Sequence, residues 1–236
     1  GMLMDTNLFE SQIRLRAPVP SGGYPGNLPV VKNLYNMEKL EFHCPVTFLV
    51  GENGIGKSTL IEAIAVSMGF NPEGGTLNFS FSTCDSHSDL YQYLSVGKTF
   101  NRRKDGFFLR AESFYNVASN IDELDRAPAF SPPIINSYGG VSLHRQSHGE
   151  GFLSLVENRF GGNGIYILDE PEAALSPNRL LRLMVLMKRL VEKNSQFIIS
   201  THSPILMSFP GAEIYQLTED SIESVPYYET EHFQIT

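Results

Sequence analysis

A short glycine-rich segment, Gly51-Glu52-Asn53-Gly54-Ile55-Gly56-Lys57-Ser58, has the residue types and spacing of a loop that holds phosphate groups. The apolar run 46–50 before it predicts a strand, and apolar residues at helical spacing over 60–68 predict a helix after it. Glycines adopt backbone conformations closed to other residues, so successive N–H groups can converge on phosphate oxygens at the start of a helix. A chance glycine-rich turn would need neither flanking element, so the segment predicts a nucleotide site.

The side chains of this loop have separate predicted roles. Lys57 is expected to reach the β- and γ-phosphates, and Ser58 to offer its hydroxyl to Mg²⁺. Thr59 is expected to contact phosphate through its backbone and its hydroxyl. The predicted nucleotide contacts in this part of the chain are Gly51, Asn53, Gly54, Gly56, Lys57, Ser58 and Thr59.

A second segment, residues 164–172, is an apolar strand that ends in adjacent carboxylates. Parallel sheets bind ligands at the carboxyl ends of their strands, where Asp169 is expected to hold Mg²⁺. Glu170 is expected to face the γ-phosphate and orient the attacking water. An acidic turn after a strand is common by itself, but its combination with the phosphate loop favours the nucleotide interpretation.

The run 197–204 repeats this design, since a buried strand is followed by polar residues that include His202. A lone histidine more often has a structural role. In combination with the two preceding strand ends, His202 is predicted to donate a hydrogen bond to the γ-phosphate.

Residues 146–151 precede an apolar stripe at helical spacing over 152–160. Ser147 stands near the N-cap position of the predicted helix, and such a helix start is a potential anion site. The segment also fits an ordinary capped helix, and the residues alone leave both interpretations open.

Taken in order, these segments resemble the ATP-binding cassette (ABC) ATPase superfamily over roughly residues 40–210. The resemblance implies a Mg²⁺-dependent ATPase, a P-loop NTP hydrolase in which Lys57, Glu170 and His202 are catalytic. It also implies a head-to-tail ATP-closed homodimer, in which Ser147 and Gly149 contact the γ-phosphate bound to the other subunit. Residues 174–177 resemble the loop that crosses that dimer interface, and Ser176-Pro177 fits the start of a further helix.

Two positions depart from the family pattern. The family has a signature segment, Ser-Gly-Gly, which residues 147–149 resemble. His148 replaces its first glycine, where the histidine side chain could crowd a phosphate or donate to it. The family glutamine after the strand at 107–110 is missing, and Glu112 stands near its place. These features make the chain more similar to a compact group of predicted bacterial ATPases than to transporter subunits.

Composition bounds the remaining possibilities. The 236 residues carry a net charge of −8, which argues against an electrostatic grip on nucleic acid. The basic run 102–104 fits a solvated hairpin turn. Cys44 and Cys84 lie far apart and in no metal-ligand spacing, which fits a reducing cytoplasm, and no apolar run is long enough to span a bilayer.

The predicted fold class is α/β, a P-loop NTPase with a mostly parallel sheet, an antiparallel N-terminal β portion from strands at 13–16 and 40–43, and a small helical subdomain carrying the signature. We expect a single domain over 1–236, with 71–160 as the inserted subdomain. Residues 18–29 predict a surface loop, residues 113–124 a helix, and 212–218 with 221–226 a terminal β pair. Tyr24 and Tyr35 are candidates for stacking on adenine or for simple packing.

Three functions are compatible with this predicted nucleotide-binding domain. The first prediction is an ATPase that uses dimer closure to remodel an unknown protein or nucleic-acid partner. The second is the ATP-binding subunit of an ABC transporter, which would meet the membrane only through a partner subunit. The third is a non-hydrolysing ATP-dependent switch, in which His148 disables the shared site.

Overall fold

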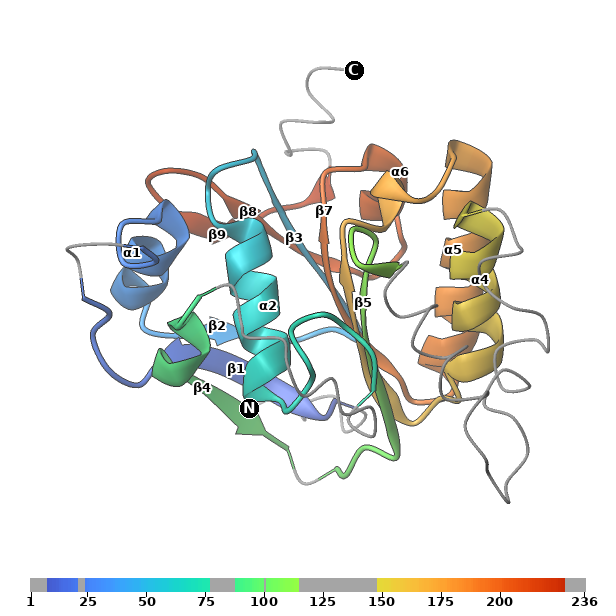
Figure 1. Cartoon of the computed structure of the whole chain (residues 1–236), viewed down its shortest axis with the longest axis horizontal. Coiled ribbons are helices and arrows are strands. Elements are labelled where there is room, and N and C mark those ends of the chain that lie inside the picture. Colours follow the sequence, from blue (N-terminus) through green and yellow to red (C-terminus); the bar gives the residue numbers. More distant parts are fainter. Residues whose placement is uncertain (1–7, 21–23, 77–87, 100, 115–147, 228–236) are drawn as a thin grey trace.

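The computed structural model describes residues 8–20, 24–76, 88–99, 101–114 and 148–227 (Figure 1). Ser147, Cys84 and nearly all of the predicted helix 113–124 lie outside these residues. In the described part of the chain, no helix is both long enough and apolar enough to cross a bilayer.

The described elements alternate between strands and helices for most of the chain. In chain order they are β1 (Glu10–Leu15), α1 (Pro29–Asn36), β2 (Leu40–Glu41), β3 (Val46–Gly51), α2 (Lys57–Ser67), η1 (Leu90–Tyr93), β4 (Leu94–Lys98), β5 (Asp105–Arg110), α4 (His148–Arg159), β6 (Gly164–Asp169), η3 (Pro171–Ala173), α5 (Pro177–Glu192), β7 (Gln196–Thr201), α6 (Pro204–Met207), β8 (Glu213–Leu217) and β9 (Ile222–Ser224).

The main sheet has the strand order β5-β6-β7-β3-β8-β9. Its first five strands are mutually parallel, and β9 returns antiparallel to β8. The central strands are apolar along both faces, as expected for parallel strands covered on both sides. The predicted fold class is therefore confirmed, and so is the terminal β pair.

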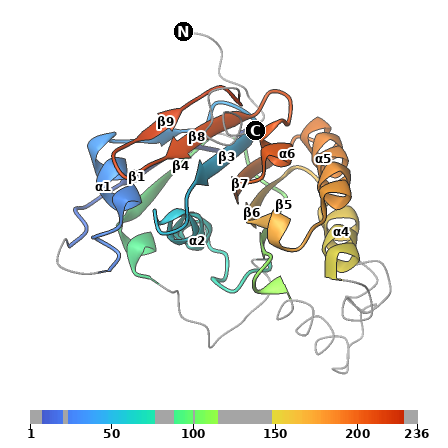
Figure 2. The ribbon, with the colours of Figure 1, turned by 90° about the horizontal axis from the view of Figure 1, so that it is seen from above.

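Helices cover both faces of this sheet. Figure 2 shows α2 on one side and α4, α5 and α6 on the other. Successive residues of one strand belong to different cores: Phe48 packs with the α4–α5–α6 side, and Leu49 packs with the α2 side. Because side chains alternate along a strand, each strand holds two helical layers in place.

A smaller antiparallel sheet, in the order β2-β1-β4, packs on the α2 side. Its β1–β2 pairing joins Ile13 to Leu40, which confirms the predicted antiparallel N-terminal portion. The predicted hairpin at 102–104 is wrong, because β4 pairs with β1 and β5 pairs with β6, so the chain crosses between sheets there. Arg103 is held inside this crossing, with its guanidinium 5.2 Å from the centre of the Phe70 ring.

Helix boundaries follow local chemistry. The described part of α4 begins at His148, and α5 begins at Pro177. Ser176 is the N-cap of α5, and its hydroxyl accepts a hydrogen bond from the backbone N–H of Arg179 at 3.4 Å. Helix α1 was not predicted; it starts at Pro29, directly after the predicted loop.

The range 71–160 contributes to several layers. It supplies β4 to the small sheet, β5 to the edge of the main sheet, and α4 to the outer layer. A separate subdomain within this range stays a prediction, because residues 115–147 lie outside the described residues.

Candidate active site

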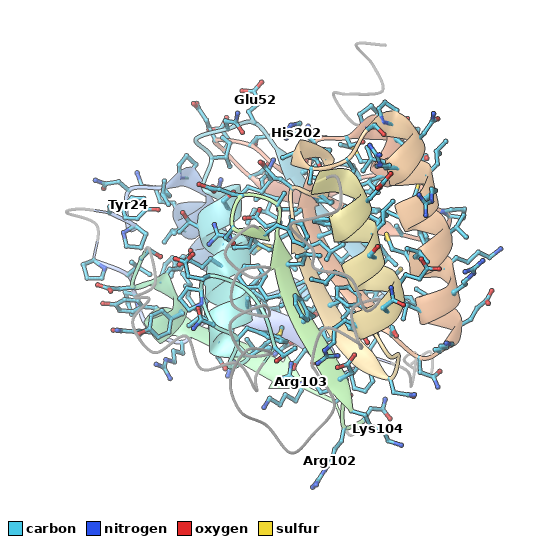
Figure 3. All side chains as sticks on the ribbon, turned by 45° about the vertical axis from the view of Figure 1, so that its right-hand side comes forward. Tyr24, Glu52, Arg102, Arg103, Lys104 and His202 are labelled. Carbon is cyan, nitrogen blue, oxygen red and sulfur yellow. The ribbon has the colours of Figure 1, made fainter. Side chains whose placement is uncertain are left out.

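Three neighbouring strands deliver the predicted catalytic side chains to one edge of the main sheet. Lys57 follows β3, Glu170 follows β6 and His202 follows β7, and these strands are adjacent in the order β6-β7-β3. Since the strands are parallel, their carboxyl ends meet at the same edge. Figure 3 shows Glu52 of the loop and His202 at this end of the molecule, opposite the basic residues 102–104.

The loop between β3 and α2 depends on its glycines. Gly56 has φ 105°, and a Cβ there would lie 2.5 Å from Val30 Cγ1. A Cβ on Gly51 would lie 2.7 Å from the carbonyl oxygen of Leu217. Gly54, with φ 89°, has open space where a Cβ would be, so its backbone is accessible to a ligand.

Lys57 is a buried cation at the start of α2, with a side-chain exposure of 3%. Its ammonium donates to the carbonyl oxygen of Gly51 at 2.9 Å and lies 3.3 Å from the Glu170 carboxylate. A buried charge requires such partners. The ammonium is therefore held between the loop carbonyl of Gly51 and the carboxylate of Glu170.

Glu170 lies between Lys57 and His202. Its Oε1 is 3.3 Å from Lys57 Nζ and 3.7 Å from His202 Nδ1. The residue has a left-handed backbone (φ 50°), which is uncommon for a side chain of this size, and its N–H donates to the Ser200 carbonyl at 2.9 Å. Strain at such a position is typical of functional sites.

Glu172 was missed by the sequence analysis, although it stands within the acidic turn. Its carboxylate accepts hydrogen bonds from the backbone N–H of His202 at 2.9 Å and from the hydroxyl of Thr201 at 2.8 Å. The His202 side chain is 43% exposed, and its Nδ1 lies 3.6 Å from Glu172. Glu172 therefore fixes the backbone that presents His202.

Ser58 and Asp169 come together as predicted for a Mg²⁺ site. The Ser58 hydroxyl lies 3.4 Å from Asp169 Oδ1, which also accepts from the Ser200 hydroxyl at 2.5 Å. Burial raises the pKa of Asp169, while the Ser200 hydrogen bond and Arg110 act against that rise. Across the described ranges, no group of three or more His, Cys, Asp or Glu side chains could hold a metal. The pair nevertheless fits Mg²⁺, which takes few protein oxygens and completes its shell with phosphate and water.

Arg110 is a second residue that the sequence analysis missed. It ends β5 directly opposite Asp169 in the parallel register, and its Nε lies 3.3 Å from Asp169 Oδ2. Its Nη1 donates to Glu62 Oε2 at 2.9 Å. The available signal was an arginine at the end of an apolar strand, which needs a partner if it is buried.

The two tyrosine candidates lie in different places. The Tyr24 hydroxyl is 2.7 Å from the Thr59 hydroxyl, so Tyr24 lies beside the phosphate loop, and its ring is exposed. Tyr35 instead lines a separate pocket of about 350 Å³, which lies between α1 and the residues Leu15, Pro18, Val19 and Gly26. The Thr59 hydroxyl, which the sequence predicts to contact phosphate, therefore pairs with the Tyr24 hydroxyl in this structure.

The described part of the signature-like segment lies at the start of α4. Gly149 is buried, and a Cβ there would lie 2.7 Å from Arg179 Cδ and 3.1 Å from the carbonyl oxygen of Ala174. Glu150 pairs with Arg179 at 3.5 Å. The signature-like segment therefore packs against the loop that the family resemblance places at the dimer interface.

Family models match both halves of the chain. Residues 32–124 match a family described as "AAA domain", and residues 141–208 match one described as "AAA domain, putative AbiEii toxin, Type IV TA system". The chain is also 26% identical over 216 residues to an "Uncharacterized ABC transporter ATP-binding protein" of Haemophilus influenzae, covering 84% of this chain and 77% of the relative.

Solved structures of ABC proteins share the fold. A nucleotide-free ATP-binding cassette from an ABC transporter matches with a TM-score of 0.54 at 17% identity, over 96% of this chain and 94% of that chain. An SMC head bound to the C-winged helix domain of ScpA matches with a TM-score of 0.54 at 13% identity, over 92% and 98%. Together these matches support an ABC-class P-loop ATPase. Transporter cassettes and SMC heads share this architecture, so the fold does not separate them.

The end of β5, where the family glutamine is missing, has one exposed and one buried charged residue. Glu112, near the place of the missing glutamine, is exposed, whereas Arg110 two residues earlier is buried. The backbone of His148 begins α4. The charged group that this segment directs into the site is therefore Arg110.

Proposed function

We propose that this protein binds ATP with Mg²⁺ and hydrolyses it, and that it uses the cycle to remodel a macromolecular partner. The observation that carries the proposal is the position of the Glu170 carboxylate between Lys57 and His202, at the carboxyl edge of three adjacent strands. A carboxylate that orients water beside a phosphate works together with donor groups placed to stabilise the charge that develops on the transferred group.

Each residue then has one task. Gly51, Asn53, Gly54, Gly56 and Thr59 offer backbone and hydroxyl groups to the phosphates, and Lys57 and His202 balance charge on the transferred group. Ser58 and Asp169 would hold Mg²⁺, which would supply positive charge to offset the negative charge of the phosphates. Glu170 accepts hydrogen bonds from the attacking water and orients it. Tyr24, the exposed aromatic beside the loop, is the candidate for stacking on the adenine.

We further propose that the site is shared between two copies of the chain in a head-to-tail dimer. Ser147 and Gly149 of one copy would meet the γ-phosphate held by the other. The support is the family resemblance together with the packing of Gly149 against Ala174 and Arg179. A cytoplasmic location accords with this proposal.

Substitution of Glu170 by glutamine tests the proposal. Because the amide keeps the size and loses the charge, we expect nucleotide affinity to stay near the wild-type value and turnover to fall at least about 100-fold. Size-exclusion chromatography with light scattering should show an ATP-dependent dimer in this variant. Lys57→Ala is the matched variant that should lose binding, and unchanged turnover in Glu170→Gln removes this carboxylate from the mechanism.

The alternative of a transporter subunit is favoured by the name of the Haemophilus influenzae relative, an ABC transporter ATP-binding protein. Stoichiometric purification with an integral membrane protein would select that function. A non-hydrolysing switch remains the third proposal. Specific activity that rises with protein concentration argues against it, since a shared site is active only in the dimer.

A further inference from the structure

We propose that Arg110 is the positioning residue for the metal ligand Asp169, and that it turns the Asp169 carboxylate so that one oxygen faces Ser58. The inference rests on the proposed function, since it concerns the Mg²⁺ that accompanies ATP. It adds a residue that has no counterpart among the sequence motifs described above.

The guanidinium of Arg110 is braced on three sides. Its Nη1 donates to Glu62 of α2 at 2.9 Å and to the carbonyl oxygen of Pro72 at 3.0 Å. Its Cζ lies 5.6 Å from the centre of the Phe108 ring. The side chain is only 8% exposed, so a planar group with these contacts has little freedom to swing.

The backbone around Arg110 is fastened as well. Gly75 and Phe108 exchange hydrogen bonds of 2.8 and 3.0 Å, and the Ser113 hydroxyl donates to the carbonyl oxygen of Glu73 at 2.6 Å. The backbone N–H of Ala111 donates to the carbonyl oxygen of Asp169 at 3.3 Å. Arg110 is therefore a fixed cation beside the end of β6.

This cation divides the work of the Asp169 carboxylate. Oδ2 forms an ion pair with Arg110 Nε at 3.3 Å, a contact outside hydrogen-bond geometry, while Oδ1 accepts from the hydroxyls of Ser200 and Ser58. Partners behind a metal ligand set its orientation, and their loss typically weakens metal binding about 10–100-fold. Arg110 also keeps a charge opposite Asp169 in a site from which water is largely excluded.

A cation near a metal site could instead repel Mg²⁺. Glu62 opposes that effect, because its carboxylate pairs with the same guanidinium at 2.9 Å and the pair carries no net charge. Orientation and repulsion predict changes of opposite sign, so experiment separates them.

The test compares the affinity for a fluorescent ATP analogue in excess Mg²⁺ with the affinity in EDTA. We expect Arg110→Met to reduce the Mg²⁺-dependent gain in affinity about 10-fold or more, with the affinity in EDTA within about 2-fold of wild type. Arg110→Lys, which keeps the charge but lacks the planar fork, should recover part of the gain. A purely structural role would lower both affinities together.

The matched control is Arg159→Met. Arg159 pairs with Asp105 at the opposite end of the same strand and lies over Phe107 at 5.8 Å, so it loses similar contacts away from the site. Its Mg²⁺-dependent gain should equal that of wild type. If Arg110→Met does not fold, the double variant Arg110→Met with Glu62→Gln also removes the buried negative charge of Glu62, which Arg110 balances in the wild type, and should show the same loss of gain.

The outcomes separate the two proposals. A wild-type protein that binds no nucleotide overturns the proposed function and this inference together. A wild-type protein with a Mg²⁺-dependent gain that Arg110→Met keeps or increases overturns this inference alone. A wild-type affinity that is independent of Mg²⁺ overturns this inference and the Mg²⁺ site of the proposed function, and leaves ATP binding standing.

Discussion

Two aspartates at opposite ends of the paired strands β5 and β6 have opposite surroundings. Asp105 begins β5 at the amino end, and Asp169 ends β6 at the carboxyl end. Asp105 accepts from Arg159 at 2.7 Å, from the Tyr166 hydroxyl at 2.7 Å and from the N–H of Gly161 at 2.9 Å. Asp169 has one short hydrogen bond, from Ser200, and two longer contacts of 3.3 and 3.4 Å.

This difference separates a carboxylate that completes the fold from one that we propose as a Mg²⁺ ligand. The Asp105 network is closed, since short hydrogen bonds occupy both of its oxygens. Asp169 is more deeply buried but less completely bonded, and it faces the hydroxyl of Ser58. Buried polar groups with incomplete hydrogen bonding need an explanation, and a Mg²⁺ site supplies one.

The sharpest test of this comparison substitutes asparagine for Asp105. The change removes the negative charge beside Arg159 and replaces one of the two acceptor oxygens by an NH₂ donor, so we expect the free energy of unfolding to fall by about 3 kcal/mol. Urea denaturation with a two-state fit measures it. A loss well under about 1 kcal/mol would mean that the hydrogen-bond network of Asp105 contributes little to the stability of the protein.

Glu10 also lies at the amino end, but its carboxylate differs from that of Asp105. Its Oε2 is buried without a hydrogen-bond partner in the described structure. Burial raises the pKa of Glu10 to about 7 from 4.5, against the opposing charges of Arg103 and Lys98. Because the pKa of Glu10 is higher in the folded than in the unfolded protein, its contribution to folding stability is fully present below pH 4.5. That contribution is lost as the pH rises to about 7.

Glu10→Gln should therefore resemble wild type near pH 4.5 and exceed it at pH 8, by up to about 3 kcal/mol in the free energy of unfolding. Urea denaturation at several pH values measures the difference. Parallel pH profiles for the two proteins would contradict the prediction and would indicate an ionised Glu10 that is stabilised in the fold.

The smallest effect is expected for Asp169→Asn, the matched partner of Asp105→Asn. Burial raises the pKa of Asp169, so a neutral amide relieves a desolvation cost, while Arg110 keeps Glu62 and the Pro72 carbonyl as partners. We expect the free energy of unfolding at pH 8 to change by less than about 1 kcal/mol without ligand. A loss as large as that of Asp105→Asn would place both aspartates in the same structural class.

The motif residues could be predicted because each follows an apolar strand. Parallel strands bring their carboxyl ends to the same edge of a sheet. The position of each motif directly after a strand was therefore enough to place Lys57, Glu170 and His202 at one edge. The phosphate loop carries its geometry in its glycines. The paired terminal strands and the start of α5 at Pro177 followed from equally local signals.

The remaining features depend on contacts between distant parts of the chain. Arg103 reads as a solvated turn residue, yet it lies over Phe70 because β4 and β5 join different sheets. Arg110 acquires its role only when β5 aligns beside β6 and α2 brings Glu62 to it. No local pattern predicts such a pairing, since it depends on strand order and register.

The grip of Glu172 on Thr201 and His202 has a mechanical consequence. It ties the turn after β6 to the turn after β7, and these turns lead into α5 and α6. With both turns anchored to one carboxylate, a displacement of either is conveyed to two helices on the same face of the sheet. The carboxyl edge of the sheet and the outer helical layer are thus joined through one carboxylate.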